Sequence, residues 1–138
     1  MTPDEVYAEA PYMSIRSDSQ RQCVVAEFKG FATSAEFRAG TMKILDAIRD
    51  RRVDSLISDN RKLEVVTDAD QMWIRDTWVP LAVAAGLKRI AVVLAKQGLG
   101  KFASQEIISQ FPDSTFVTRT FDSLDEAKKW VATGAKPG

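Results

Sequence analysis

The sequence predicts an α/β protein that folds as one domain. The chain has 138 residues, of which 45% are hydrophobic and 28% are charged, values typical of a single globular domain with a substantial core. After two initial strand-like segments, apolar runs alternate with helical patterns in the order β-β-α-β-α-β-α-β-α. This order predicts a mixed sheet of about five strands covered by helices. We expect the domain to span residues 11–132, between an N-terminal tail at 1–10 and a C-terminal tail at 133–138.

The first half of the domain begins with a predicted hairpin. Residues 12–16 and 23–28 are rich in strand-forming residues, and the short polar link between them favours antiparallel pairing. A helix then begins at the capping box Thr33-Ser34-Ala35-Glu36 and ends in an arginine-rich turn. Residues 53–58 form the next predicted strand, which runs into a polar loop.

The second helical region has an internal proline. Its first turn is Thr67-Asp68-Ala69-Asp70, a typical helix start, and Gly86 is a good helix terminator. Pro80 cannot donate a backbone hydrogen bond to the carbonyl of Asp76, so we expect a kink near residues 76–79. Residues 88–95 follow as a continuous apolar run, which predicts a central parallel strand.

The last third of the chain repeats the strand and helix alternation. We expect a helix from about residue 98 to 111, a strand over residues 114–121, and a final helix. Ser123 and Glu126 have the spacing of a second capping box at the start of that final helix.

Several absences restrict the chemistry. The chain has no histidine and a single cysteine, Cys23, which lies in an apolar run and is expected to be buried. Histidine-dependent catalysis, an intrachain disulfide and most zinc or iron sites are therefore excluded, and we expect no cofactor. Lys plus Arg and Asp plus Glu both number 19, so a nucleic-acid partner is not expected. Without a signal-like N-terminus or an apolar run of membrane-spanning length, we expect a cytoplasmic protein.

Asp59 and Arg61 are the charged candidates for a site. They follow the predicted strand 53–58, and ligands of α/β sheets gather at the carboxyl ends of strands. The alternative is a solvated turn in which the two side chains pair with each other.

Trp73 and Trp78 are the aromatic candidates. Five residues apart on a helix, they project about 140° apart and cannot share one narrow stripe. Trp78 lies on the apolar face and is expected in the core. Trp73 is expected at an edge, as a pocket wall or dimer contact, with partial core burial as the alternative.

Two further patterns favour structural roles. The segment Gly98-Leu99-Gly100-Lys101 lacks the first glycine and the hydroxyl residue of a phosphate loop, so we expect a flexible αβ loop there and no nucleotide binding. A local concentration of basic residues is explained by the negative end of a helix, although a phosphate or acidic partner remains the alternative. These basic residues are Arg49, Arg51, Arg52, Arg61 and Lys62.

The chain also resembles a known family. The resemblance extends from about residue 12 to 131 and rests on these segments: Glu36-Phe37-x-x-Gly40, Ile44-Leu45-Asp46, Leu56-Ile57-Ser58-Asp59-Asn60-Arg61, Trp73-Ile74-x-x-x-Trp78-x-Pro80, Ala85-Gly86-Leu87-Lys88-Arg89 and Phe121-x-Ser123-x-x-Glu126-Ala127-x-x-Trp130. They resemble small bacterial STAS-like proteins, which are grouped with anti-sigma-factor antagonists and, more loosely, with CRAL-TRIO lipid-transfer domains. The resemblance implies a STAS-like fold and a regulatory or binding role.

One feature of the antagonist branch is not expected to apply. That branch has a regulatory serine at the start of the helix after the third strand, where this chain has an acid beside Thr67. A phosphate there would be repelled by Asp68 and Asp70, so Thr67 is expected to act as a helix cap.

Two classes of function follow. The first is a non-catalytic STAS-like module that binds a protein partner, a second copy of the chain, or a small apolar or lipid-like ligand. The second is an enzyme of unknown reaction that uses carboxylate and arginine groups, centred on Asp59 and Arg61. We expect Asp59, Arg61, Trp73 and Trp78 to contribute to ligand or partner binding.

Overall fold

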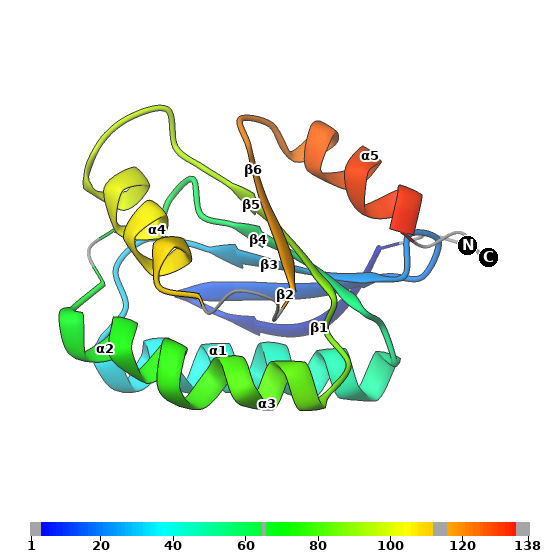
Figure 1. Ribbon diagram of the computed structural model, residues 1–138, viewed down its shortest axis with the longest axis horizontal. Helices are drawn as coiled ribbons and strands as arrows, with labels where there is room; N and C mark the ends of the chain where they lie inside the picture. Colours follow the sequence, from blue (N-terminus) through cyan, green and yellow to red (C-terminus); the bar gives the residue numbers. More distant parts are fainter. Residues whose placement is uncertain (1–3, 65, 112–115, 135–138) are drawn as a thin grey trace.

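A single mixed sheet forms the centre of the molecule (Figure 1). The computed structural model describes residues 4–64, 66–111 and 116–134. The sheet contains six strands whose spatial order equals their order along the chain. The strands are β1 (Asp4–Ala10), β2 (Met13–Asp18), β3 (Cys23–Phe28), β4 (Ser55–Asp59), β5 (Arg89–Val93) and β6 (Val117–Phe121). β1, β2 and β3 pair antiparallel, and β3 to β6 pair parallel.

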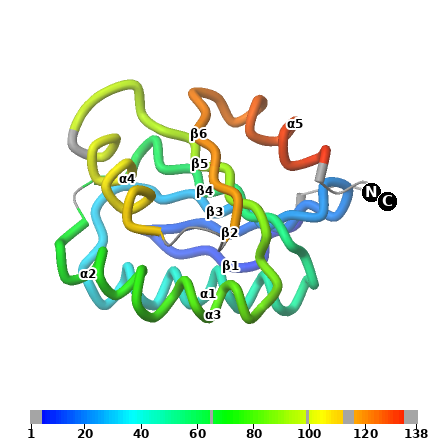
Figure 2. The backbone as a smooth tube through the Cα atoms, in the orientation of Figure 1, coloured from blue at the N-terminus to red at the C-terminus, as the bar shows by residue number. Residues whose placement is uncertain are grey.

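Helices cover both faces of the sheet, as the tube in Figure 2 also shows. They are α1 (Ser34–Arg51), α2 (Asp68–Trp73), the π-helix η1 (Ile74–Trp78), α3 (Val79–Ala84), α4 (Leu99–Ser109) and α5 (Leu124–Gly134). Alternate strand residues divide the core in two. Val24, Leu56 and Ile90 pack with α1, η1, α3 and α4, whereas Val25, Ile57 and Ala91 pack with α5.

The main sequence predictions are confirmed. The fold is an α/β domain with a mixed sheet, and β2 and β3 form the predicted hairpin. The predicted capping box starts α1: Thr33 Oγ1 accepts from Glu36 N at 3.2 Å, and Glu36 Oε1 accepts from Thr33 N at 2.9 Å. Thr67 caps α2 by accepting from Asp70 N. Cys23 is buried.

The expected N-terminal tail is wrong for residues 4–10, which form the edge strand β1. The sequence hides this strand because the register shifts between Val6 and Ala8, and such a bulge breaks the alternation of side chains. The side chains of β1 are held by polar contacts with α1: Tyr7 Oη donates to Asp50 at 2.5 Å, and Glu5 pairs with Arg51 at 2.9 Å. At the other end, α5 reaches Gly134, and residues 135–138 of the expected C-terminal tail lie outside the described residues.

The predicted central position of the strand at residues 88–95 is also wrong. β5 lies between β4 and β6, one strand from the edge, in a sheet of six strands and not about five. Its side chains are buried on both faces because α5 covers one side and the other helices cover the opposite side. The continuous apolar run therefore predicted burial on both faces correctly. Such a run does not indicate how far the strand lies from the edge of the sheet.

The irregularity predicted at Pro80 is present as η1. The π-helix ends at Trp78, and its wide turn is closed by the Val79 amide, which donates to the carbonyl of Ile74. Pro80 is the second residue of α3. Because a proline ring clashes with the carbonyl four residues before it, a widened turn at this point accommodates the ring without breaking the helical path.

Candidate functional site

An apolar pocket lies between the sheet and the helices α1, η1 and α4. Its cavity volume is about 80 Å³, and the cavity opens to solvent at its mouth. Phe28, Leu56 and Ile90 form its floor on the sheet, and the walls come from the helices, with Phe37 on α1 and Ile107 on α4. A mostly apolar concavity with a few polar groups is the usual form of a small-molecule site.

The π-helix places two large side chains in this pocket. Ile74 and Trp78, at the two ends of η1, both line it. The Trp78 ring is fixed because its Nε1 donates a 2.7 Å hydrogen bond to the backbone oxygen of Thr41 on α1. The indole nitrogen is thereby satisfied, and the ring offers an apolar surface to the pocket.

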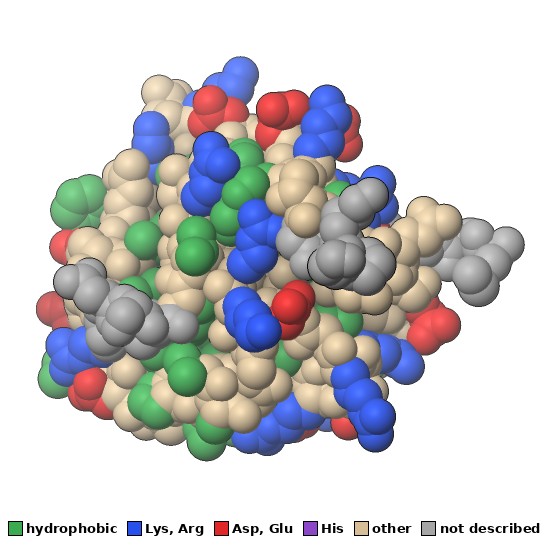
Figure 3. Space-filling model, turned by 45° about the vertical axis from the view of Figure 1, so that its right-hand side comes forward, with side chains coloured by type: hydrophobic (Ala, Val, Ile, Leu, Met, Phe, Trp, Pro, Cys, Tyr) green, Lys and Arg blue, Asp and Glu red, His purple; other side chains and the backbone are tan. Residues whose placement is uncertain are grey.

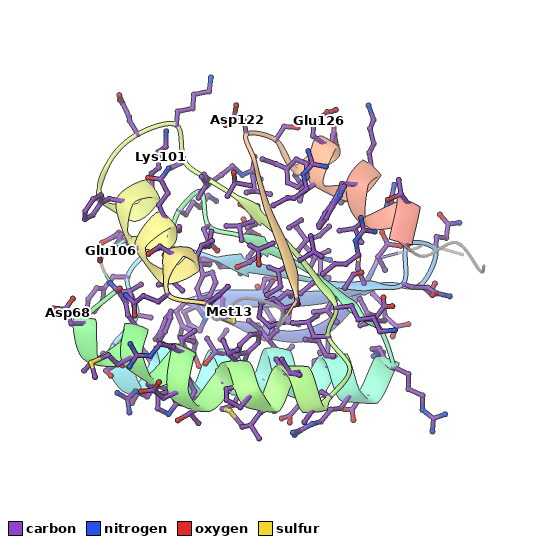
Figure 4. The ribbon with its side chains drawn as sticks, in the orientation of Figure 1. Met13, Asp68, Lys101, Glu106, Asp122 and Glu126 are labelled. Carbon is purple, nitrogen blue, oxygen red and sulfur yellow. The ribbon has the colours of Figure 1, made fainter. Side chains whose placement is uncertain are left out.

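The helix α4 forms the remaining wall and approaches the loop after β4 closely. A Cβ atom at Gly100 would lie 1.8 Å from the carbonyl oxygen of Leu63, so only glycine fits there. Farther along α4, Glu106 accepts from Gln71 Nε2 of α2 at 3.2 Å. Figure 4 shows Glu106 on α4 above the start of α2 at Asp68. Both contacts hold α4 over the pocket.

The pocket has one polar wall, at the end of β4. Ser58 Oγ donates to Asn60 Oδ1 at 2.6 Å, and Asn60 Nδ2 donates to Ser104 Oγ at 3.0 Å. All three residues line the pocket. This chain of hydrogen bonds joins the carboxyl end of β4 to α4, and it holds the Asn60 side chain between Ser58 and Ser104.

Asp59 and Arg61 lie on the opposite face of the sheet, beside α5. Arg61 Nε and Nη2 donate to the two carboxylate oxygens of Asp59 at 2.9 and 2.7 Å. The Asp59 side chain is 5% exposed and that of Arg61 is 46% exposed. The hydrogen bond that Arg61 donates to Asp59 raises the pKa of Arg61 and outweighs burial, which lowers it.

A second, charged pocket surrounds this pair. Its lining includes Glu27, which is the neighbour of Asp59 in the β3–β4 register, together with Arg16 and Lys128. Glu27 is paired with Lys62 at 3.7 Å. The sequence did not indicate Glu27, because register partners on different strands cannot be read from spacing along the chain.

Trp73 lies outside both pockets, next to a buried carboxylate. The guanidinium of Arg38 lies 5.4 Å from the centre of the Trp73 ring and also donates to Asp70 Oδ1 at 2.8 Å. Burial alone would raise the pKa of Asp70, but hydrogen bonds from Ser34, Arg38 and Thr67 outweigh it and lower that pKa. Trp73 thus covers one side of an ion pair that links α1 to α2.

The structure therefore distributes the four candidate residues over three places. Trp78 lines the apolar pocket, Asp59 and Arg61 line the charged pocket, and Trp73 lies at the α1–α2 contact. A binding role for all four residues, Trp78 included, stays a prediction. The sequence did not indicate Asn60 and Ser104 as site residues, since they meet only through the packing of α4 on β4.

The other sequence patterns have structural explanations. The loop expected at residues 98–101 is wrong from Leu99 onward, because α4 begins there. Gly100 is required by the contact with Leu63, and Lys101 Nζ donates to the backbone oxygen of Lys96. The basic residues do not form one group, because Arg49, Arg51 and Arg52 precede β4 while Arg61 and Lys62 follow it. Figure 3 shows Lys, Arg, Asp and Glu side chains dispersed over one side of the surface.

Among the residues that the structure describes, no group of three or more cysteine and acidic side chains is placed to hold a metal ion. Within the same ranges, the helices are too short or too polar to cross a membrane.

Comparison with known proteins gives one match. No curated protein sequence and no solved structure matches the chain significantly. A family model described as SpoIIAA-like matches residues 23–132, from the first residue of β3 into α5. The match covers most of the chain. It includes the parallel strands that line the two pockets, and it agrees with the STAS-like sheet of the structure. On this evidence the chain belongs to the SpoIIAA-like family.

Proposed function

We propose that this SpoIIAA-like protein is a non-catalytic module that binds a small apolar molecule in the pocket between the sheet, α1, η1 and α4. The observation that carries the proposal is the pocket itself, whose lining is dominated by aliphatic and aromatic side chains. Apolar cavities of this kind bind hydrocarbons because the ligand exchanges water contacts for dispersion contacts.

The way in which the pocket is built favours a ligand-binding site over a defect in the packing of the core. Proteins fill most internal space, and an apolar cavity costs stability. Here the space is bounded by a π-helix, which is rare and is often found at functional sites. The space is also bounded by α4, which can approach Leu63 closely because residue 100 is a glycine.

Family membership supports a regulatory role without catalysis, and a protein partner is the second candidate. Phe31 and Phe102 are large apolar side chains that are 71% and 61% exposed, which suits a protein contact. The enzyme alternative is less well supported, because the Asp59 carboxylate is already bound at both oxygens by Arg61. Formation of a homodimer stays a prediction.

The test is binding of ethylbenzene, a small hydrocarbon, followed by calorimetric titration and by the melting temperature. We expect saturable binding and a stabilisation that grows with ligand concentration, about 1.4 kcal/mol at ten times the dissociation constant. Native mass spectrometry of the purified protein adds a direct readout, in which a retained small-molecule mass supports ligand binding and a dimer mass supports self-association.

A pair of variants controls the location of binding. Ile107→Trp places a bulky ring in the pocket from α4 and should abolish binding of ethylbenzene. Val83→Trp adds the same ring at an exposed position of α3, and it should leave binding unchanged. Binding that survives Ile107→Trp in a folded protein, or no binding by the wild type, would contradict the proposal.

A further inference from the structure

The polar wall of the apolar pocket is a short chain of hydrogen bonds. Asn60 Oδ1 accepts from Ser58 Oγ at 2.6 Å, and Asn60 Nδ2 donates to Ser104 Oγ at 3.0 Å. The Asn60 backbone is fixed as well, because its N–H donates to the carbonyl of Val93 at 2.9 Å. These bonds hold the Asn60 amide between Ser58 and Ser104, and with Nδ2 turned toward Ser104 the proton of the Ser104 hydroxyl is left free.

This wall presents hydrogen-bond donors that are not used by the described part of the chain. An asparagine amide carries two N–H groups, and Asn60 uses one of them on Ser104. The Ser104 hydroxyl accepts that bond, and no described residue accepts its own proton. Asn60 is 8% exposed and Ser104 is 1% exposed, so these donors are buried, where an unused donor costs free energy.

The rest of the pocket offers no charge. Among its described lining residues none is Lys, Arg, Asp or Glu. A carboxylate or ammonium group in such a site would lose its hydration without gaining a countercharge. A neutral oxygen acceptor, by contrast, needs only a donor, and a carbonyl oxygen can accept two hydrogen bonds.

We infer that the ligand of this pocket is an uncharged molecule with an apolar body and a carbonyl oxygen, such as a ketone, ester or amide. The carbonyl oxygen accepts from Ser104 Oγ, whose own proton is free while Asn60 Nδ2 donates to it, and the apolar body lies against Trp78 and Ile107. This inference rests on the proposed function, and it adds the chemical class of the ligand.

Three probes of similar size test the inference: ethylbenzene, acetophenone and benzoate. Their dissociation constants are measured calorimetrically for the wild type, Ser104→Ala and Asn60→Ala. We expect acetophenone to lose about 3- to 10-fold in affinity in Ser104→Ala, the effect of one neutral hydrogen bond. The affinity for ethylbenzene should change less than two-fold, and benzoate should bind more weakly than acetophenone.

Ser109→Ala is the matched control, since it makes the same substitution on α4 at an exposed serine and should leave all three affinities unchanged. The inference is overturned if acetophenone binds equally well to the wild type, Ser104→Ala and Asn60→Ala, or if benzoate binds most tightly. In either case retained binding of ethylbenzene leaves the proposed function standing. If none of the probes binds the wild type, the proposed function fails and this inference fails with it.

Discussion

The indole nitrogen of Trp78 donates to the backbone oxygen of Thr41 across 2.7 Å, and this bond ties η1 to α1. Trp78 comes from the π-helix and Thr41 from the buried side of α1, and both residues line the apolar pocket. The bond therefore sets both the distance between two walls and the plane of the ring that a ligand would contact.

Trp78→Phe should lower stability and pocket affinity together. The substitution removes one hydrogen bond and part of a buried ring, and we expect the free energy of unfolding to fall by about 1–3 kcal/mol. Urea unfolding measures this loss. Trp73→Phe is the control, because the Trp73 ring lies outside the pocket and its stability change should be smaller. Equal losses in the free energy of unfolding would show that the Trp78–Thr41 hydrogen bond contributes no more to stability than the contacts of Trp73.

Pro80→Ala should weaken binding of ethylbenzene while leaving the free energy of unfolding nearly unchanged. Alanine supplies a backbone N–H that can donate to the carbonyl of Asp76, so the widened turn of η1 is no longer required. We expect the free energy of unfolding to change by less than about 1 kcal/mol. The affinity for ethylbenzene should fall, because Ile74 and Trp78 at the ends of η1 would shift. A folded variant with unchanged affinity would show that Pro80 does not shape the pocket.

The Asp59–Arg61 pair should respond asymmetrically to substitution. Arg61→Ala leaves a carboxylate that is 5% exposed without its cation, whereas Asp59→Asn leaves a half-exposed guanidinium that water can solvate. We expect a loss of about 1–3 kcal/mol for Arg61→Ala and about 0–1 kcal/mol for Asp59→Asn, with solvent screening reducing both. Chemical denaturation of each variant checks the order, and a larger loss for Asp59→Asn would contradict it.

Asp70 should make the stability of the protein depend on pH in the acid range. Its pKa is lowered in the folded state, so its carboxylate stabilises the fold above the unfolded pKa of about 3.9. That contribution is lost as the pH falls through the folded pKa. The stability difference between wild type and Asp70→Asn should therefore be constant near pH 7 and narrow below about pH 4. Denaturant unfolding at a series of pH values measures the difference, and a gap that widens in acid would refute the assignment.

Local signals in the sequence were sufficient for most elements of the fold. The capping boxes, the apolar runs and Pro80 each act through neighbours a few residues away, and the structure has a helix start, a strand or an irregular turn at each place. The sequence does not predict β1 because its bulge breaks the alternation of inward and outward side chains. Its contacts with Asp50 and Arg51 join residues far apart in the chain, which local patterns do not show.

The site was less predictable for the same reason. Asp59 was expected to matter because it follows a strand, but neither its face of the sheet nor its neighbour Glu27 can be deduced without the register. Asn60 and Ser104 are 44 residues apart in the chain, and they meet only through the packing of α4 on β4.

The most direct test of the proposed pocket uses the indole signals of the three tryptophans, Trp73, Trp78 and Trp130. In a proton–nitrogen NMR correlation spectrum each indole N–H gives one peak, and substitution of each tryptophan assigns it. Trp78 lines the pocket, whereas Trp130 lies on α5 against Phe121, across the sheet. On titration with ethylbenzene we predict a saturable shift of the Trp78 peak and an unchanged Trp130 peak. An unchanged Trp78 peak, or a shift concentrated at Trp130, would contradict binding in this pocket.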